Sequence, residues 1–159
     1  LITSSVRRPS PDVLDPKIHH CNLIQSILAK IEANHAGADD AVMLDSRGYV
    51  AETNATHLFI VEDGTVITSR LVACPEGITR EVVLGLCRDN DIPHEVRDVS
   101  LTEVYRADEL FCTGTMGELA PVTQVDGRPI GGGETGPVTQ RLAKLFDACV
   151  AAEAEPVLD

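Results

Sequence analysis

The chain has 159 residues, of which 43% are hydrophobic and 24% charged, and its mean hydropathy is near zero. These values fit one globular domain with a real core, or part of a larger protein. A formal net charge of −12 argues against nucleic acid or an anionic membrane as a partner, because both require basic patches. No apolar run approaches the roughly 20 residues that cross a bilayer, and no signal peptide is visible.

The cysteines are odd in number and scattered, and no CxxC occurs, so neither a disulfide framework nor a metal site is expected. We predict reduced, mostly buried thiols in a cytoplasmic protein. Because the chain starts at Leu1 and its only methionines are Met43 and Met116, we expect a trimmed or fragmentary product. The five cysteines are Cys21, Cys74, Cys87, Cys112 and Cys149.

The first third of the chain predicts a linker followed by a helix. Residues 1–15 carry Ser, Arg and Pro with little periodicity and are typical of a strand remnant and linker. Residues 22–36 form an amphipathic helix, since apolar residues recur there at helical spacing. The apolar residues are Leu23, Ile24, Ile27, Leu28 and Ile31.

The middle of the chain predicts short strands joined by hairpin turns, then a helix. Asp45–Gly48 and Glu62–Gly64 are turn sequences. Thr79 is expected to cap a helix that reaches Asp89. The predicted strands are residues 41–44, 49–52, 57–61 and 66–68.

The last third continues this mixture of elements. Ser100 caps a short helix over residues 101–107, and a glycine loop at 131–133 precedes a final helix from Pro137. Strands are expected at 93–99, 109–112 and 121–125, and residues 153–159 form a tail. Irregular alternation with hairpins predicts an α+β fold, with residues 16–152 as one domain.

Four features carry chemistry. Lys17 is the one lysine outside the predicted helices, since Lys30 and Lys144 lie within them. Glu52 ends a strand, Gly77-Ile78-Thr79 opens a helix, and Thr113-Gly114-Thr115 ends an apolar strand. An amine nucleophile, a carboxylate and two small polar loops suit pyridoxal phosphate (PLP): the amine forms a Schiff base, the acid pairs with the pyridinium nitrogen, and the loops hold the phosphate.

Each feature also has a plainer interpretation. A lysine such as Lys17 is most often a surface residue, and Gly77–Thr79 alone is most often a helix cap. Glu52 can equally be a solvated strand end, and Thr113–Thr115 a turn that ends a strand. His19 and His20 are adjacent, but no spaced third ligand accompanies them, so a polar approach to the helix is favoured over a metal site. No P-loop, GxSxG or HExxH motif occurs.

Taken in order, the motifs resemble the C-terminal large domain of the class IV aminotransferases, the PLP fold type IV family of branched-chain and D-amino acid aminotransferases, (R)-amine transaminases and 4-amino-4-deoxychorismate lyase. The resemblance covers about Asp15 to Phe146 and implies short mixed strands in a barrel-like sheet with flanking helices. Its markers are residues 15–34, 44–64, 77–83, 107–131 and 136–142.

The resemblance assigns roles to these positions. Lys17 would hold the cofactor as an internal aldimine and move the proton between substrate and cofactor. Glu52 would pair with the pyridine nitrogen. Ile78, Thr79 and Thr115 would bind the phosphate, and Thr115 and Met116 would border the substrate carboxylate. The implied reaction is ping-pong transamination between an amino acid, branched-chain or related, and a 2-oxo acid.

Three departures from the family pattern stand out. Lys17 lies five residues before Asn22, where relatives have three or four, and an ungapped register would place Ile18 or His19 at the lysine position. Lys17 is preferred because no other lysine is near and a loop can absorb the extra residue. Leu23 stands where branched-chain enzymes have Tyr, whose hydrogen bond would be absent or come from elsewhere, such as His19 or His20. His57 replaces a common Asn.

The resemblance also implies an N-terminal small domain that this chain lacks, which supplies an arginine to the phosphate and much of the substrate pocket, and a homodimer. Two alternatives stay open beside the aminotransferase. One is a lyase that releases pyruvate, although the loop Thr113–Thr115 favours transamination. The other is an inactive, truncated PLP-fold domain.

Overall fold

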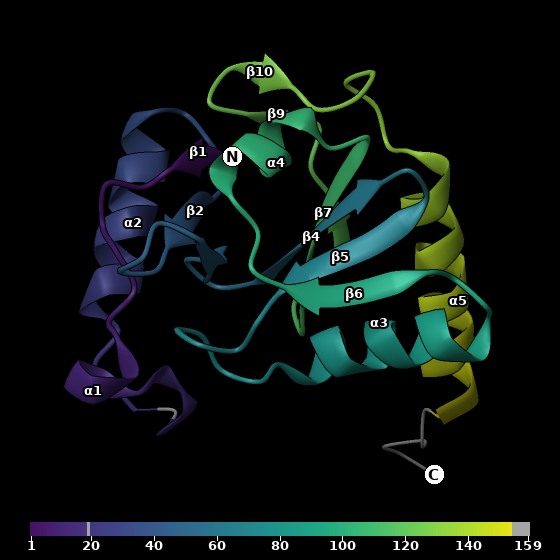
Figure 1. The fold of residues 1–159 in the computed structure, drawn as a ribbon, viewed down its shortest axis with the longest axis horizontal. Coiled ribbons are helices and arrows are strands. Elements are labelled where there is room, and N and C mark those ends of the chain that lie inside the picture. The colour runs from purple at the N-terminus through teal and green to yellow at the C-terminus, as the bar shows by residue number, and fades with distance from the viewer. Residues whose placement is uncertain (19, 154–159) are drawn as a thin grey trace, which may run out of the picture.

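The computed structural model describes residues 1–18 and 20–153 (Figure 1). Its helices are α1 (Pro11–Leu14), the 3-10 helix η1 (Pro16–Ile18), α2 (Ile24–His35), α3 (Ile78–Asp89), α4 (Leu101–Arg106) and α5 (Pro137–Glu153). Its strands are β1 (Ile2–Thr3), β2 (Ala41–Leu44), β3 (Val50–Thr53), β4 (His57–Glu62), β5 (Thr65–Ser69), β6 (His94–Arg97), β7 (Glu109–Gly114), β8 (Glu118–Pro121), β9 (Gln124–Val125) and β10 (Arg128–Pro129).

A five-stranded mixed sheet in the order β6-β5-β4-β7-β8 forms the centre of the molecule. Its strand pairs are antiparallel except β5 with β6, which run parallel after the crossover through α3. A three-stranded sheet, β1-β2-β3, and the two-stranded β9-β10 hairpin complete the strands. This mixture of hairpins and helices confirms the predicted α+β class.

Helices α3 and α5 cover one face of the central sheet (Figure 1). Side chains alternate along β4 and β7, so Phe59 and Phe111, which are direct partners, lie on this face. Their rings stack with centroids 4.9 Å apart. Val83 and Leu84 of α3 and Leu142 of α5 pack against them in one apolar cluster. This cluster fixes where α3 and α5 begin relative to the strands.

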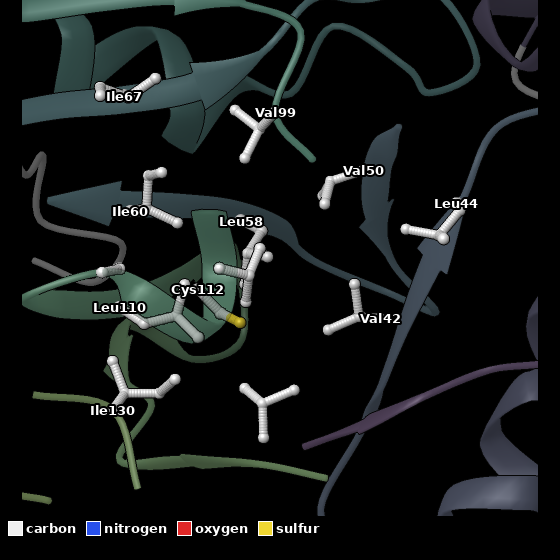
Figure 2. Packing of buried hydrophobic residues seen from close by; sticks show 13 residues of the cluster. Val42, Leu44, Val50, Leu58, Ile60, Ile67, Val99, Leu110, Cys112 and Ile130 are labelled. Carbon is white, nitrogen blue, oxygen red and sulfur yellow. The ribbon is translucent and has the colours of Figure 1, made fainter. Parts of the chain in front are cut away.

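The opposite face of the central sheet packs against the smaller sheet. Leu58, Ile60 and Leu110 meet Val42 and Val50, as Figure 2 shows. All of these side chains are aliphatic, as the scarcity of aromatic residues predicts. The two sheets therefore share a core that holds the end of β3 close to the start of β4.

The helix predicted over residues 22–36 is present as α2, but its large apolar residues do not face the core. Ala29 and Ala33 are its buried residues and pack on the smaller sheet against Ala41 and Met43. The larger apolar residues of α2 and of its N-cap face outward, with exposed fractions from 43% to 55%. Small alanines let the helix lie close to the sheet, so the periodic large residues occupy the other side. These exposed residues are Leu23, Ile24, Ile27, Leu28 and Ile31.

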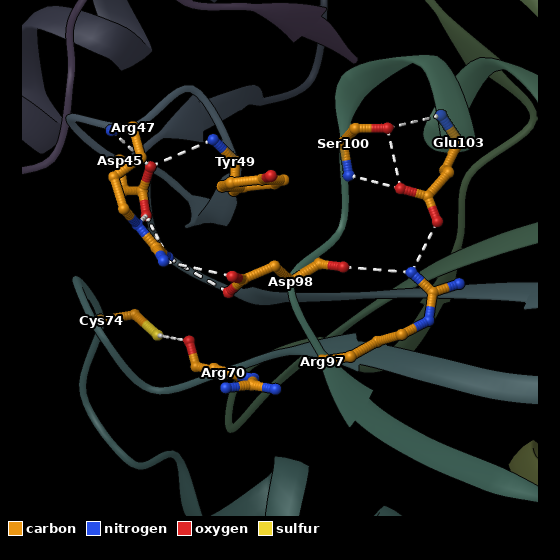
Figure 3. A network of polar contacts seen from close by, with 9 residues as sticks. All are labelled: Asp45, Arg47, Tyr49, Arg70, Cys74, Arg97, Asp98, Ser100 and Glu103. Carbon is orange, nitrogen blue, oxygen red and sulfur yellow. Dashed lines mark hydrogen bonds and ion pairs between the residues drawn. The ribbon is translucent and has the colours of Figure 1, made fainter.

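The segment between β6 and α4 is fastened by a polar network (Figure 3). Ser100 caps α4 as predicted: its hydroxyl accepts from the Glu103 N–H, and the Glu103 carboxylate accepts from the Ser100 N–H. Arg97 donates to Glu103 at 2.5 Å. Arg47 donates to both Asp45 and Asp98, which ties the β2–β3 turn to this segment.

Two local predictions were wrong. The strand expected over residues 121–125 is two strands, β8 and β9, because the chain leaves the central sheet after Pro121 and enters a separate hairpin. Thr79 is not a helix cap: α3 begins at Ile78, and its N-cap is Gly77, which has a φ of 70° and no side chain to cap with. No helix in residues 1–18 or 20–153 is long and apolar enough to cross a membrane.

Candidate active site

A cavity of about 580 Å³ brings together segments that are far apart in sequence. The start of α3, the ends of β3 and β7, and Lys17 of η1 line it. Five of the six predicted site residues line it, all except Met116. The lining residues are Lys17, Glu52, Ala55, His57, Pro75, Glu76, Gly77, Ile78, Thr79, Arg80, Thr113, Gly114 and Thr115.

A second cavity, of about 660 Å³, lies between the N-terminus and the β8–β9 segment. It is the larger of the two, but none of the predicted site residues lines it. Titratable side chains are few there, with Asp39, Asp40 and Cys112 among its walls. We take the 580 Å³ cavity as the candidate active site because it is the one that the predicted site residues line.

Glu52 lies at the cavity wall and is buried, with 3% of its surface exposed. Its carboxylate forms an ion pair with the Arg8 guanidinium, which is itself mostly buried. Arg8 also donates to Ser26 of α2 at 3.0 Å, and its backbone N–H donates to Leu44. The pair keeps a negative charge at the cavity wall in a place where an isolated carboxylate would be costly.

Lys17 reaches the same cavity from η1. Its ammonium group lies 3.1 Å from the Asp15 carboxylate, and its backbone N–H donates to that carboxylate at 3.0 Å. These bonds lower the pKa of Asp15, the backbone N–H first. Ile18, an alternative position in the family register, is largely exposed and does not line the cavity. His19 lies outside the described residues.

The first turn of α3 opens onto the cavity. Ile78 lines the cavity, and 86% of its surface is exposed. A Cβ on Gly77 would overlap the His57 ring, which means that glycine is required both for the positive φ and for this close approach. The N–H groups of a first helical turn lack intrahelical partners and favour anions.

The loop after β7 contributes Thr113, Gly114 and Thr115 to the cavity wall. Met116, predicted to border a substrate, is fully exposed and is not among the lining residues. A Cβ on Gly114 would come within 2.9 Å of the Thr56 methyl group, so glycine lets this loop lie close to the loop after β3. Of the two residues predicted to border the substrate carboxylate, Thr115 lines the cavity and Met116 does not.

Sequence reasoning gave no individual role to three side chains in or beside this site: Arg80 and Thr113 line the cavity, and Arg8 pairs with Glu52 on its wall. Arg8 was placed in a linker, and its partner Glu52 is 44 positions away, so nothing local signals the pair. Arg80 follows the Gly77–Thr79 motif and is buried. Thr113 is the first residue of the Thr113–Thr115 motif and is also buried. One signal was available for two of them. Arg80 is a charged residue in the first turn of a helix, and Thr113 is a hydroxyl residue near the end of a strand, at a position that alternates with the buried Phe111.

His57 lies at the start of β4, directly opposite Thr113 of β7. Burial lowers the pKa of His57 to about 4, and the nearby Arg80 and Arg8 cations contribute to this lowering. The imidazole is therefore neutral at physiological pH. Burial also raises the pKa of Cys74 to about 11, which keeps that neighbouring thiol protonated.

Leu23, which replaces the family's tyrosine, and His20, a suggested source of the missing hydrogen bond, do not line the cavity. Leu23, at the position of the family's tyrosine, is more than half exposed and borders a separate cavity of about 80 Å³. His20 also borders that smaller cavity and not the candidate site. Within residues 1–18 and 20–153, no group of three or more His, Cys, Asp or Glu side chains could hold a metal ion.

Comparison with known proteins places this arrangement in a family. The model of the family Amino-transferase class IV matches residues 1–125. The chain belongs to the class IV aminotransferases, as its motifs indicated.

Individual relatives agree with this assignment. The Arabidopsis thaliana protein named branched-chain-amino-acid aminotransferase-like protein 2 is 48% identical over 157 residues, covering 99% of this chain and 28% of that protein. A putative branched-chain-amino-acid aminotransferase of Methanocaldococcus jannaschii is 42% identical over 146 residues, covering 91% of this chain and 51% of that protein. The chain therefore spans about a quarter to a half of these relatives.

Solved structures share the fold. The branched-chain amino acid aminotransferase of Thermobaculum terrenum, in its PLP form, has a TM-score of 0.91 and 35% identity, over 96% of this chain and 51% of that one. The Escherichia coli branched-chain amino acid aminotransferase has a TM-score of 0.91 and 32% identity, over 99% of this chain and 54% of that one. The predicted large-domain fold is confirmed at this level of similarity.

Proposed function

We propose that this chain is the PLP-binding part of an aminotransferase that exchanges the amino group of an amino acid, branched-chain or related, with a 2-oxo acid. One observation carries the proposal: a single cavity joins the Lys17 amine, the Glu52 carboxylate and the open first turn of α3. The Thermobaculum terrenum relative, whose structure is of the PLP form, supports the choice of cofactor.

The residues present fit PLP. An anionic phosphate matches the uncapped first turn of α3, where Ile78 and Thr79 offer N–H groups and Thr79 a hydroxyl. Thr115 lies across the same cavity, and the buried Thr113 hydroxyl has no hydrogen-bond partner among the described residues. At the other wall, Glu52 offers a carboxylate to a protonated ring nitrogen. Donors from the first turn of α3 and an acceptor from Glu52, all on the wall of one cavity, match a phosphorylated pyridine.

Each side chain then has a definite task. When bound, PLP supplies the electron sink that allows the hydrogen on the substrate α-carbon to leave as a proton. Lys17 would hold the cofactor, and its free amine would take up and return that proton. Arg8 pairs with Glu52, whose carboxylate would accept a hydrogen bond from a protonated ring nitrogen. Lys17 is free to act only after it leaves Asp15, which holds it at 3.1 Å.

The first test is amino-group exchange by the 159-residue chain supplied with PLP, leucine and 2-oxoglutarate. We expect glutamate to form, and Lys17→Ala to abolish its formation while the fold persists. Glu52→Gln should retain bound PLP and slow turnover by roughly 100-fold, because the ring loses its anionic partner. Lys30→Ala, within α2, is the matched control. Release of pyruvate without exchange would favour a lyase, and unchanged turnover in Lys17→Ala would reject the assignment.

Homodimer formation and a cytoplasmic location belong to the same proposal. The exposed apolar residues of α2 follow η1, which carries Lys17, in the chain, and a second copy would cover them. We expect Ile27→Glu with Ile31→Glu to convert a dimer to a monomer in sedimentation, with the circular dichroism spectrum unchanged. A matched change at a polar site of the same helix, Gln25→Glu, should leave the dimer intact. A wild-type monomer would contradict the proposed assembly.

A further inference from the structure

Asp15 is the one carboxylate among the described residues that contacts the amine of Lys17. A single oxygen, Oδ1, lies 3.1 Å from the ammonium nitrogen and also accepts a hydrogen bond from the Lys17 backbone N–H at 3.0 Å. Glu52, the buried carboxylate of the candidate site, is paired with Arg8 instead. Glu76 lines the cavity, but no ion pair joins it to Lys17 within residues 1–18 and 20–153. The immediate environment of the amine is therefore set by Asp15.

The local sequence fixes the position of Asp15. The residue before a proline is restricted to extended backbone, and Asp15, which precedes Pro16, has a φ of −67° and a ψ of 115°. Pro16 is buried, and the Asp15 carbonyl accepts from the Ile18 N–H at 3.1 Å, which closes η1. An aspartate in such a turn commonly accepts from the backbone two residues on. The carboxylate is thus held over the turn that carries Lys17 by contacts that do not involve the ammonium.

The pair lies at the boundary between the cavity and solvent. The Lys17 side chain exposes 37% of its surface and the Asp15 side chain 29%. Lys17 lines the cavity, whereas Asp15 is not among the lining residues. The backbone N–H of Lys17, followed by its side chain, lowers the pKa of Asp15, so the carboxylate is ionised at neutral pH. The ammonium is therefore held by a charged partner that stands outside the cavity.

We propose that Asp15 is a positioning residue for Lys17: its charge holds the ammonium at the cavity wall, and the amine reacts with an aldehyde only when this contact breaks. The inference rests on the proposed function, in which Lys17 reacts with the aldehyde of PLP. An ammonium has no lone pair, so Nζ must first give one proton to solvent. Its lone pair then forms the bond to the aldehyde carbon, and its two remaining hydrogens leave with the carbonyl oxygen as water. A partly exposed pair is weak, so Asp15 slows this reaction without preventing it.

The test compares the wild type with Asp15→Asn and Asp12→Asn. Asp15→Asn removes the charge but keeps an oxygen that can accept from the Lys17 N–H, so η1 should persist. Asp12→Asn, in α1, makes the same change of net charge, and its side chain contacts Ser10 and not Lys17. Each protein is treated briefly with acetic anhydride, and mass spectrometry gives the ratio of acetylation at Lys17 to acetylation at Lys144. Lys144, in α5, is the internal reference.

The acetylation ratio should rise about 2- to 5-fold in Asp15→Asn at neutral pH and low salt, and stay at the wild-type value in Asp12→Asn. The rise should shrink when sodium chloride reaches about 1 M, since salt screens an exposed pair. An unchanged ratio in Asp15→Asn would overturn the proposal and leave Asp15 a residue that only shapes the turn. An equal rise at low and high salt would also overturn it, because charge would then not be the cause. Should Asp15→Asn fail to fold, the wild-type ratio decides alone: it should increase with salt, and a constant ratio would reject the proposal.

A second reaction keeps this inference separate from the proposed function. With PLP followed by borohydride, the rate at which the adduct forms on Lys17 should rise in Asp15→Asn by about the same factor as acetylation. An acetylation ratio that depends on Asp15, without a PLP adduct on Lys17 in either protein, would uphold the Asp15 contact and reject the proposed function. An adduct that forms on Lys17 at the same rate in wild type and Asp15→Asn would uphold the proposed function and reject this inference.

Discussion

Helices α3 and α5 begin at opposite ends of the same pair of strands, and their first turns are treated differently. Glu109, Phe111 and Thr113 alternate along β7 toward the face that both helices cover. At one end the buried Glu109 carboxylate accepts from the N–H groups of Val138 and Thr139, at 2.9 and 2.7 Å, so α5 receives its anion from the chain.

At the other end, no carboxylate among the described residues accepts a hydrogen bond from the first-turn N–H groups of α3. The neutral His57 and the Thr113 hydroxyl lie beneath its first turn, and the turn opens onto the 580 Å³ cavity. The same fold therefore satisfies one helix start with its own carboxylate and leaves the other open to a cavity. The open first turn is specific to α3, because the first turn of α5 is closed by Glu109.

The largest expected effect on stability comes from the stacked pair Phe59 and Phe111, against which both helices pack. Phe111→Ala removes one ring of the stacked pair beneath both helices and should lower the free energy of unfolding by about 3–5 kcal/mol. Urea denaturation measures this loss. Ile78→Ala, at the exposed start of α3, should change stability by less than about 0.5 kcal/mol. Similar losses from both variants would show that the start of α3 is packed and not open.

His57 makes the two ends differ in their response to pH. Its folded pKa, about 4, lies below the unfolded value of 6.5, so the unfolded state takes up a proton first as the pH falls. This group therefore stabilises the fold fully above pH 6.5, and its contribution is lost between pH 6.5 and 4. The total loss is about 3 kcal/mol.

The matched variant is His57→Asn, which does not titrate. Relative to this variant, wild type should lose about 2 kcal/mol of unfolding free energy between about pH 7.5 and 5, as measured by urea denaturation. If the unfolding free energies of the two proteins changed in parallel with pH, His57 would be accessible to water and not buried beside α3.

A smaller effect is expected at the closed helix start. Glu109→Gln keeps the shape of the side chain but removes the charge from two helix N–H bonds, and it should cost about 1–3 kcal/mol. Thermal unfolding measures it, with Glu134→Gln on the exposed loop before α5 as the control. PLP binding at α3 should be unaffected, and a loss of PLP affinity would show that the two helix starts are not independent.

The sequence predicted what local patterns determine. Hairpin turns, the cap at Ser100 and the helix start at Gly77–Thr79 each depend on a few adjacent residues, and these elements are found in the structure. The class IV motifs also predicted which segments meet, and Lys17, Glu52 and Thr115 do share one cavity. The roles assigned to these residues remain predictions.

Long-range pairing could not be predicted in the same way. Nothing near Arg8 indicates Glu52, and nothing near Glu109 indicates the start of α5, because both contacts depend on the finished fold. Helix α2 shows the same limit. Its periodic large residues indicate an apolar face, but Ala29 and Ala33 are the residues that meet the sheet, and periodicity alone does not say what covers a face.

The most direct test of the central claim is to incubate the chain with PLP, reduce it with borohydride, and map the modified peptide by mass spectrometry. If the cavity at the start of α3 is a formed PLP site, one stoichiometric adduct will appear on Lys17. Substoichiometric label spread over Lys17, Lys30 and Lys144 would contradict the account, because it would mean that the cavity does not direct the cofactor to any one amine.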